Sequence, residues 1–318
     1  TAFSTTEATA RIEVQYINDA PEISFTTINM NEINEDNPDN GIEIVDLLSD
    51  PNLDYFDVDQ DENLNDDDDA LDLNEGMAIV TADNDHGEWE YSTNSGNSWT
   101  SITGVSENNT LLLIPTDRIR FNPTTHYNGN NIILEFKAWD QSDVGDNTIP
   151  DGGTTAFSQT ISNISIDIQY VNDAPEIDAV IVDLDPINED DFTSSGTLVS
   201  FLLDQENLNH FDVDQDEGLN EDAGVPDNNE GMAITSTDTD NGSWEYSADD
   251  GSNWTSMGNA SEGSALLLEP DWRVRFVPIP DYNGFSTFDF QAWDQSDDSV
   301  DATVNAGTTS FSSNVAIA

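Results

Sequence analysis

The stretch Tyr16-Ile-Asn-Asp-Ala-Pro-Glu-Ile23 occurs again as Tyr170-Val-Asn-Asp-Ala-Pro-Glu-Ile177, 154 residues later. Three further segments return at an offset of 154 or 155 residues, and their first copies are Phe56-Asp-Val-Asp-Gln-Asp-Glu62, Glu75-Gly-Met-Ala-Ile79 and Trp139-Asp-Gln-Ser142. A period of this kind indicates two copies of one structural unit. We predict that residues 1–19 are the last strand and linker of a preceding repeat, 20–173 a first repeat, and 174–318 a second repeat with a truncated last strand.

Apolar and polar residues alternate within each copy, which is the pattern of half-buried β-strands. The alternation is clear in Arg11-Ile-Glu-Val-Gln-Tyr16, in Ile164-Ser-Ile-Asp-Ile-Gln-Tyr170 and in Arg118-Ile-Arg-Phe121. Pro, Gly, Asn and Asp separate these segments, and no helical period extends beyond a turn or two. The sequence therefore predicts an all-β protein of tandem Ig-like or cadherin-like β-sandwiches, arranged as an extended rod.

The charge of the chain is strongly one-sided, with 66 Asp and Glu against 6 Lys and Arg, a formal net charge of −60. Nucleic acid and anionic membrane are excluded as partners, because both require clustered basic residues. Disorder does not fit the 7 Trp, 7 Tyr and 14 Phe that lie in alternating segments. Two explanations of the charge remain, namely a salt-adapted solvated surface and the binding of divalent cations. With no cysteine, disulfides cannot brace the fold, and metal is the usual substitute.

The segment Asp57-Val-Asp-Gln-Asp61, repeated as Asp212-Val-Asp-Gln-Asp216, spaces three carboxylates at every second residue. A compact loop can turn such oxygens toward one point, and calcium takes six to eight oxygen ligands. An EF-hand is excluded, because its sixth position needs glycine and holds Glu62 or Glu217 here. A calcium loop of another kind and a solvated acidic loop both remain open.

Four other acidic clusters occur at equivalent places in the two copies, although Asn-Asp before proline is also good turn chemistry. We predict Ca²⁺ as the cofactor. The candidate ligands are Asn18, Asp19, Glu35, Asp36, Asp57, Asp59, Asp61, Asp83, Asp85, Asp140, Asn172, Asp173, Glu189, Asp190, Asp212, Asp214, Asp216, Asp238, Asp240 and Asp294.

The order of these clusters resembles the cadherin family. The matching pieces are Glu35, Asp238-Thr-Asp-Asn-Gly-Ser-Trp-Glu-Tyr246, Ala292-Trp-Asp294 and Val171-Asn-Asp-Ala-Pro175. The resemblance implies that these ligands converge on calcium ions between successive domains and stiffen the joint. The linker is shorter than in cadherins, there is no Leu-Asp-Arg-Glu motif, and the acidic loops at Asp57 and Asp212 are additions to the cadherin order.

A closer resemblance is to cadherin-like repeats of very large, RTX-type bacterial adhesins. The run from Gly231 to Ser296 contains Gly-Met-Ala-Ile, Gly-Ser-Trp-Glu-Tyr-Ser, Leu-Leu-Leu, Arg-Val-Arg-Phe, Tyr-Asn-Gly and Ala-Trp-Asp-Gln-Ser. The resemblance implies an extracellular extender on a bacterial cell surface. The expected partners are neighbouring repeats of the same chain, and a cell-surface or polysaccharide ligand is open. We expect a monomer without membrane contact.

We expect no enzyme activity, because tandem duplication of the same acids indicates structure and not an active site. His86, His126 and His210 occupy non-equivalent positions and are interpreted as incidental surface residues. Ser247-Ala-Asp-Asp-Gly-Ser-Asn-Trp254 resembles the Asp-box hairpin of sialidases, which is a structural turn. One alternative function remains, calcium-dependent carbohydrate binding on an aromatic platform of Trp89, Trp99, Trp244, Trp254 and Trp272, for which core packing is the simpler explanation.

Overall fold

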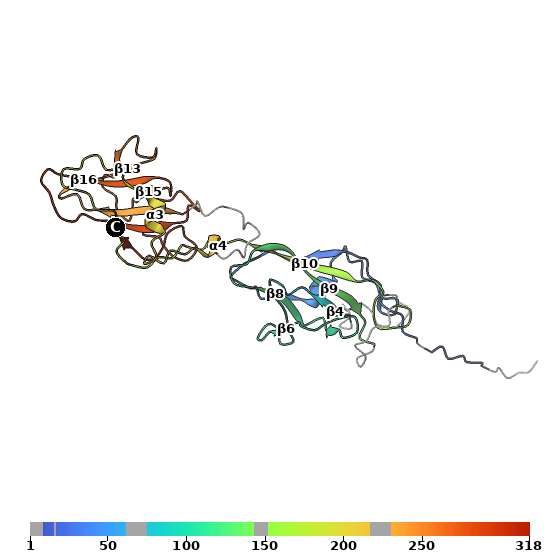
Figure 1. Cartoon of the computed structure of the whole chain (residues 1–318). Helices are drawn as coiled ribbons and strands as arrows, with labels where there is room; N and C mark the ends of the chain where they lie inside the picture. Colours follow the sequence, from blue (N-terminus) through green and yellow to red (C-terminus); the bar gives the residue numbers. More distant parts are fainter. Residues whose placement is uncertain (1–8, 16, 62–74, 143–151, 217–229) are drawn as a thin grey trace, which may run out of the picture. The chain divides into compact units, whose positions relative to one another are not determined.

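The computed structural model describes residues 9–15, 17–61, 75–142, 152–216 and 230–318. The chain divides into two compact units, of which unit 1 comprises residues 1–124 and 130–168, and unit 2 residues 125–129 and 169–318 (Figure 1). The predictions that concern residues 1–8, Tyr16, Glu62 and Glu217 lie outside the described residues, as do those that concern the side chains of Asp61 and Asp216.

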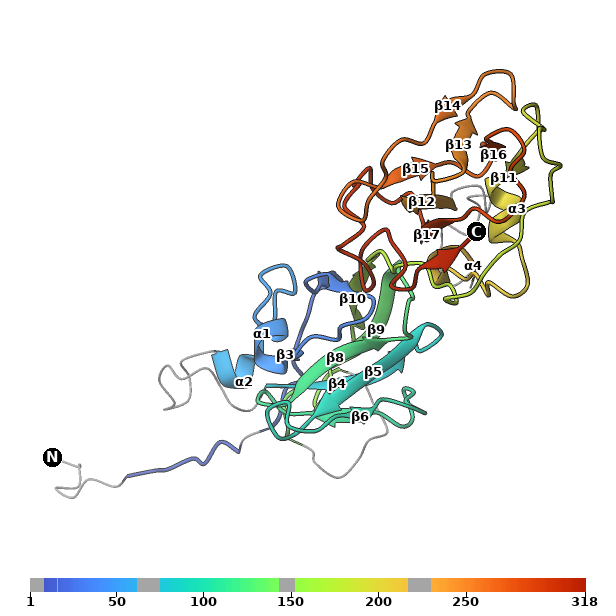
Figure 2. The same ribbon diagram turned by 90° about the vertical axis from the view of Figure 1, so that its left-hand side faces the viewer.

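Unit 1 is built from short strands and two helices of a single turn. Its strands are β1 (Thr27–Asn29), β2 (Ile33–Asn34), β3 (Ile42–Glu43), β4 (Gly76–Ala82), β5 (Gly87–Ser92), β6 (Thr100–Ser101), β7 (Leu111–Leu113), β8 (Arg118–Pro123), β9 (Gly129–Trp139) and β10 (Ser162–Gln169). Its helices are α1 (Ile44–Leu48) and α2 (Val58–Asp61). One sheet has the order β1-β10-β9-β4-β7, with β2 also on β10, and the other has the order β3-β8-β5-β6 (Figure 2).

Unit 2 repeats this plan in two four-stranded sheets, with the orders β11-β16-β13-β14 and β15-β12-β17-β18. Its strands are β11 (Thr197–Leu198), β12 (Gly231–Thr237), β13 (Gly242–Ser247), β14 (Thr255–Ser256), β15 (Leu266–Leu268), β16 (Arg273–Pro278), β17 (Phe288–Trp293) and β18 (Ala316–Ile317). Its helices are α3 (Val199–Leu203) and α4 (Val213–Asp216).

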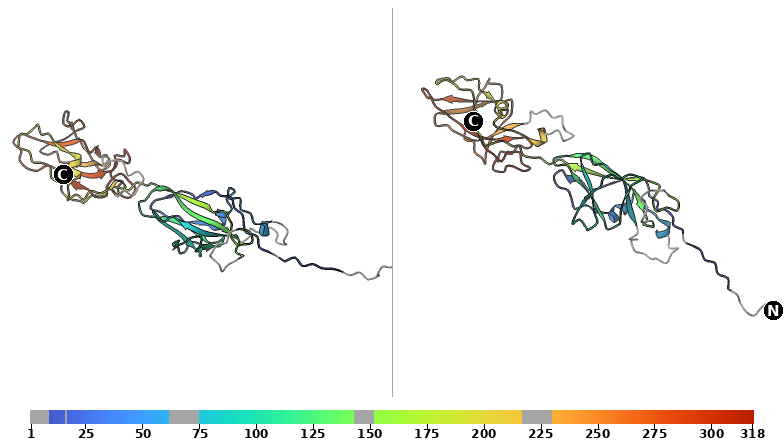
Figure 3. Two further views of the ribbon diagram at one scale, coloured as in Figure 1. Left: turned by 45° about the vertical axis from the view of Figure 1, so that its right-hand side comes forward. Right: turned by 60° about the horizontal axis from the view of Figure 1, so that its bottom comes forward.

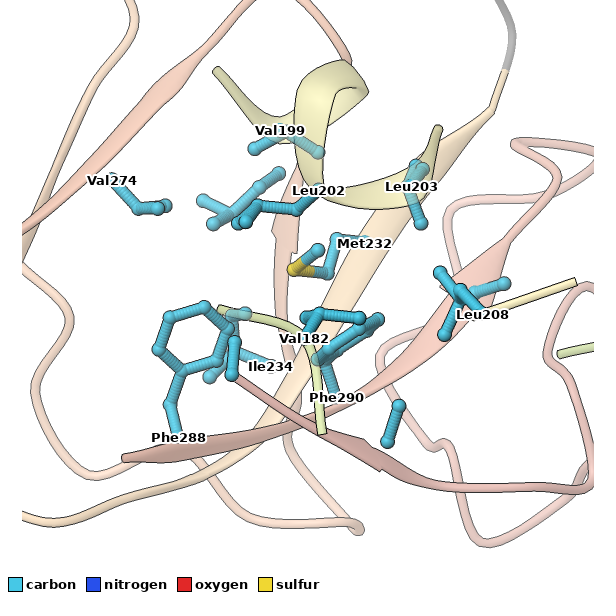
Figure 4. Close-up of a cluster of buried hydrophobic side chains, with 14 of the residues drawn as sticks. Val182, Val199, Leu202, Leu203, Leu208, Met232, Ile234, Val274, Phe288 and Phe290 are labelled. Carbon is cyan, nitrogen blue, oxygen red and sulfur yellow. The ribbon is translucent and has the colours of Figure 1, made fainter. Parts of the chain in front are cut away.

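The core of each unit lies between its two sheets, which confirms the predicted β-sandwich. In unit 2, Trp244 of β13 meets Phe288 of β17 edge to face, with ring centroids 4.9 Å apart. Helix α3 adds Val199, Leu202 and Leu203 to the same cluster (Figure 4). Alternation places these apolar side chains inward while the polar neighbours face out. The all-β class is therefore confirmed.

One predicted strand does not form. Residues 9–15 have no strand partner in the described part of the chain and extend away from the sheets of unit 1 (Figure 3). The side chains of Ile12 and Val14 are 90% and 86% exposed. The alternating pattern is the same as that of β10, but a strand needs a neighbour for its backbone N–H and C=O groups, and only β10 has one.

Candidate calcium-binding ends of the two units

The predicted ligands divide between the two ends of each sandwich. In unit 2, Gly231 of β12 pairs with Trp293 of β17, and Thr237 pairs with Phe288. Asp294 directly follows Trp293, whereas Asp238 directly follows Thr237. The two carboxylates therefore lie at opposite ends of a seven-residue ladder, about 20 Å apart.

Unit 1 has the same division, because Gly76 pairs with Trp139 and Ala82 with Leu134. Asp140 follows the first pair and Asp83 the second. We call the end that holds Asp140 or Asp294 the acidic end of its unit, and the opposite end the far end.

The acidic end of unit 2 is tied together by the side chains of the Asn-Asp joint and the Asp-Val-Asp loop. Asn172 Nδ2 donates to Asp294 Oδ2 at 2.8 Å and to the Thr309 carbonyl at 3.2 Å. The backbone N–H of Asp173 donates to Asp214 Oδ2 at 2.7 Å. These bonds bring together four segments of the chain, which contain Asn172 with Asp173, Asp214, Asp294 and Thr309.

The local conformation of the Asp-Val-Asp loop follows from its sequence. Asp212 precedes helix α4, and its Oδ1 accepts a hydrogen bond from the backbone N–H of Asp214 at 3.0 Å. An aspartate is a favoured residue at this position, because its carboxylate satisfies an N–H that the helix leaves unpaired. Asp294 likewise accepts a hydrogen bond from the backbone N–H of Ser296, at 2.7 Å. Each carboxylate is thus held in one orientation.

Unit 1 repeats this network at its own acidic end. Asn18 Nδ2 donates to Asp140 Oδ2 at 2.9 Å and to the Thr155 carbonyl at 3.1 Å. The backbone N–H of Asp19 donates to Asp59 Oδ2 at 2.6 Å, and that of Asp59 to Asp57 Oδ1 at 2.9 Å. The same contacts at equivalent residues show that the network belongs to the repeat and not to one copy.

Electrostatic repulsion is concentrated at the acidic end of unit 2. Burial raises the pKa of the Asp214 carboxyl, and the charges of Asp173 and Asp294 act in the same direction. The hydrogen bonds from the Asp173 N–H and the Tyr170 hydroxyl oppose this rise. A carboxylate oxygen of Asp173 lies within 4.8 Å of one of Asp214. A cation at this end would relieve the repulsion.

Tyr170 is a member of this network that the sequence did not reveal. Its hydroxyl lies 3.0 Å from both Asn172 Oδ1 and Asp214 Oδ2. Although half of the residue is exposed, burial of the hydroxyl and the charge of Asp214 raise the pKa of Tyr170. The hydroxyl therefore stays protonated and serves as a donor. Its position two residues before the Asn-Asp joint is the available sequence signal.

The arginines of the described strands pair with acids other than the predicted ligands. Both arginines of each Arg-x-Arg strand point to the outer face of their sheet, as the alternation predicts. The ion pairs are Arg118–Glu43 at 2.9 Å, Arg120–Glu90 at 2.7 Å, Arg273–Asp250 at 2.6 Å and Arg275–Glu245 at 2.7 Å. Asp140 and Asp294 are each only 5% exposed, and their hydrogen-bond donors in the described part of the chain are neutral.

The acidic end carries oxygens of the kind that calcium prefers, carboxylate and carbonyl, and a carboxylate oxygen of Asp173 lies within 4.8 Å of one of Asp214. In unit 2 the oxygens come from Asp173, Asp212, Asp214 and Asp294, with the amide of Asn172 beside them. Asp214 Oδ1 is buried and accepts no hydrogen bond from the described residues. Because a buried anionic oxygen without a partner is costly, this atom is suited to a metal.

The remaining predicted ligands lie at the far ends. Asp83 and Asp238 each accept a hydrogen bond from the backbone N–H two residues on, that of Asp85 or Asp240, at 3.1 and 3.0 Å. These are local turns. The structure therefore does not bring Asp238 and Asp240 to Asp294, although the order of motifs grouped them. The acidic loops at Asp57 and Asp212, which are additions to the cadherin order of motifs, lie beside Asp140 and Asp294, respectively.

The Asn-Glu-Asp clusters also lie toward the far ends. Asp190 Oδ1 accepts a hydrogen bond from the backbone N–H of Asp281, in the connection between β16 and β17, and Glu189 precedes it. In unit 1, Glu35 and Asp36 follow β2. This strand pairs with β10, as does the preceding strand β1, which runs parallel to β10.

The tryptophans are mostly structural. Trp89 and Trp244 are buried in the cores, at 0% and 4% exposure, so neither can offer a surface to a sugar. Arg120 lies over the Trp99 ring at 4.2 Å, and Arg275 over Trp254 at 4.0 Å.

Trp272 stacks on Tyr246 at a centroid distance of 5.5 Å. The turn between β13 and β14 closes as an Asp-box resemblance implies, with Asp249 Oδ1 accepting from the Asn253 N–H at 2.7 Å.

The interpretation of His210 as a surface residue was wrong, because its side chain is 8% exposed and its Nδ1 lies 3.3 Å from Glu230 Oε2.

Fold and site together define a tandem all-β protein whose sandwiches each carry an acidic end. No family model and no curated protein matches the chain. Among solved structures, human mucin-like protocadherin EC1-2 is similar at 10% identity and a TM-score of 0.34, over 93% of this chain and 96% of that one. A mutant of the CFA/I enterotoxigenic E. coli adhesin CfaE is similar at 9% identity and a TM-score of 0.28, over 93% and 98%.

The endo-fucoidan hydrolase MfFcnA4 of glycoside hydrolase family 107 is similar at 10% identity and a TM-score of 0.27. The likeness covers 94% of this chain, which spans 28% of the length of that hydrolase. Similarities of this size carry no argument about function. In the described residues no helix is both long and apolar enough to cross a bilayer.

Proposed function

We propose that the chain is a pair of calcium-stabilised extender repeats of a bacterial cell-surface adhesin, without enzyme activity. The observation that carries the proposal is the acidic end, which has the same hydrogen bonds in both units. The chain has no cysteine, so an extracellular protein of this sequence must be stabilised by something other than disulfides, which supports the proposal. The proposed location on a bacterial surface rests on the resemblance of the repeated motifs to adhesin repeats.

In unit 2, Asp212, Asp214 and Asp294 would hold the metal, with Asp173 and Asn172 contributed by the joint. Calcium supplies positive charge and a shared coordination shell for oxygens that otherwise repel. The Asn172 side chain fastens the joint to the end of β17, and the Asp173 N–H fastens it to the acidic loop. The joint segment is thereby held on unit 2, and a chain of such repeats becomes stiffer when the charge is neutralised.

The stabilisation follows from binding linkage. A site with a dissociation constant of about 10⁻⁴ M in about 10⁻² M calcium stabilises the folded state by ~2.7 kcal/mol. Two such sites would rival a large part of the stability of an ordinary domain. Calcium would thus set the folding of each unit as well as the stiffness of the chain.

Calorimetry of the whole chain in calcium and in EDTA tests the proposal. We expect a higher melting temperature in calcium and at least one site per unit by isothermal titration. Magnesium at the same concentration is the control for ionic strength, since it rarely accepts an all-protein oxygen cage. Equal melting temperatures in calcium and EDTA would refute the calcium role. Small-angle scattering profiles that are the same in both conditions would refute the stiffening.

A further inference from the structure

Unit 1 has a pocket where the residues after the Asn-Asp joint meet the loop that precedes β10. The pocket has a volume of about 440 Å³, which lies within the range of small-ligand sites. Its walls come from three segments, which contribute Glu22 with Ile23, Phe56, and Gln159 with Thr160. The pocket is therefore built by parts of unit 1 that are far apart in the sequence.

Backbone hydrogen bonds hold these walls in place. The Ala20 N–H donates to the Gly153 carbonyl at 2.9 Å, which joins the first segment to the loop before β10. Glu22 and Phe56 exchange two backbone hydrogen bonds, at 2.8 and 3.0 Å. Because the walls are fixed by the main chain, the side chains that line the pocket are not needed to keep it open.

The equivalent place in unit 2 is bridged by a side chain. The counterparts of Ile23 and Thr160 are Ile177 and Asn314, both at an offset of 154 residues. Asn314 Nδ2 donates to the Ile177 carbonyl at 2.7 Å and thereby spans the gap. Thr160 is shorter than asparagine and leaves this space open in unit 1. The opening thus follows from a difference between the two copies at one position.

The polar side chains of the pocket are available to a ligand. Among the described residues, those of Glu22, Gln159 and Thr160 have no hydrogen-bond or ion-pair partner. A carboxylate, an amide and a hydroxyl together offer both donors and acceptors. Phe56 is 40% exposed and adds a flat apolar surface beside them. The pocket therefore suits a ligand with several hydroxyl groups and one apolar face.

The charge of the pocket limits the ligand further. Asp19 and Glu22 both line it, and no basic residue does so in the described part of the chain. An anionic ligand would meet two carboxylates without a compensating cation. The ligand class that remains has hydroxyl groups, an apolar face and no negative charge.

We infer that this pocket of unit 1 binds a neutral sugar ring of a glycan. Phe56 packs against the apolar face of the ring, Glu22 accepts from its hydroxyl groups, and Gln159 and Thr160 donate to them. The inference moves the sugar site away from the tryptophans, which are buried in the cores or covered by other side chains. It goes beyond the extender role, because Asp19 is the only predicted calcium ligand that lines the pocket.

Saturation-transfer NMR of the full chain in calcium tests this inference. The probes are the methyl glycosides of glucose, galactose, mannose and fucose at millimolar concentration, with methyl glucuronide as the anionic comparison. We expect saturation transfer to at least one neutral glycoside and none to the glucuronide.

The variant Thr160→Asn introduces the residue that bridges the equivalent place in unit 2. It should close the pocket and weaken binding of the neutral glycoside at least about tenfold. Thr154→Asn is the matched control, because it makes the same change at an exposed position of the same loop outside the pocket. Thr160→Asn should keep the calcium-induced rise in melting temperature, so that the sugar site and the calcium role are tested separately.

Four results would overturn the inference. The first is that none of the neutral glycosides binds, and the second is that the glucuronide binds as well as they do. The third is binding that survives Thr160→Asn and is lost in Trp99→Ala, which would place the sugar on the tryptophans. The fourth is arginine methyl ester binding more tightly than every glycoside and competing with them, which would make the pocket a site for organic cations.

Discussion

The substitution Asp294→Asn tests the acidic end most directly, because it removes a charge while keeping the shape of the side chain. Asp294 is 5% exposed, and its two oxygens accept from Asn172 Nδ2 and the Ser296 N–H. The new amide retains one oxygen for the Ser296 N–H. Without calcium, the variant also loses a negative charge that raises the pKa of Asp214 by repulsion.

The two conditions should therefore give different results. In EDTA the lost hydrogen bond and the relieved repulsion oppose each other, and we expect a change of less than about 1 kcal/mol. In calcium the variant lacks one of the anionic ligands, so that most of the ~2.7 kcal/mol of linkage should disappear from unit 2. For a unit of this size, the loss corresponds to a fall in melting temperature of roughly 5–10 °C.

Differential scanning calorimetry in EDTA and in about 10⁻² M calcium measures both numbers. Asp298→Asn is the matched control, because it removes the same charge from an exposed position four residues further on. Asp140→Asn should produce the same loss in unit 1 and leave the transition of unit 2 unchanged. If Asp294→Asn kept the full calcium-induced rise in melting temperature, the assignment of Asp294 as a ligand would be wrong.

Two further substitutions test the packing around the strands. Burial raises the pKa of Asp117, so its folded form binds a proton more readily than the unfolded form, and the free energy of unfolding falls as pH rises above about 3.9. Asp117→Asn should therefore stabilise unit 1 at pH 7 and not at pH 3 in urea titrations, and Asp271→Asn at an exposed position in unit 2 is the matched control. A Cβ on Gly231 would lie 2.6 Å from the Trp293 ring and 2.9 Å from the Leu268 carbonyl oxygen, so Gly231→Ala should destabilise unit 2 by about 1–3 kcal/mol. Gly263→Ala, with nothing within 4 Å, should stay within about 0.5 kcal/mol of wild type by chemical denaturation.

Most of the fold could be predicted from the repeat and from the period of two, because both are properties of the local sequence. Alternation identifies which side chains share a face, and it correctly predicted the strands β8 and β10. Alternation does not identify the segment with which a strand pairs. Residues 11–15 have the pattern of β10 but form no strand, because pairing depends on backbone groups contributed by other segments.

The candidate site was predicted in part for a related reason. The sequence revealed the acidic motifs but not the end of the sandwich at which each would lie. Two motifs that flank antiparallel strands can be adjacent or a full strand length apart, and the pairing of β12 with β17 decides this. Tyr170 could not be selected from composition, because its role comes from two hydrogen bonds to residues 2 and 44 positions away.

The burial of the acidic ends bears on the two explanations of the net charge. A salt-adapted surface accounts for carboxylates that face water, and many acids in the described residues are of that kind. It does not account for Asp140 and Asp294, which are each 5% exposed. Removing carboxylates from water next to one another destabilises a fold unless a cation or a strong donor compensates. We propose a bound cation as the reason for the retention of Asp140 and Asp294 at equivalent places in the two units.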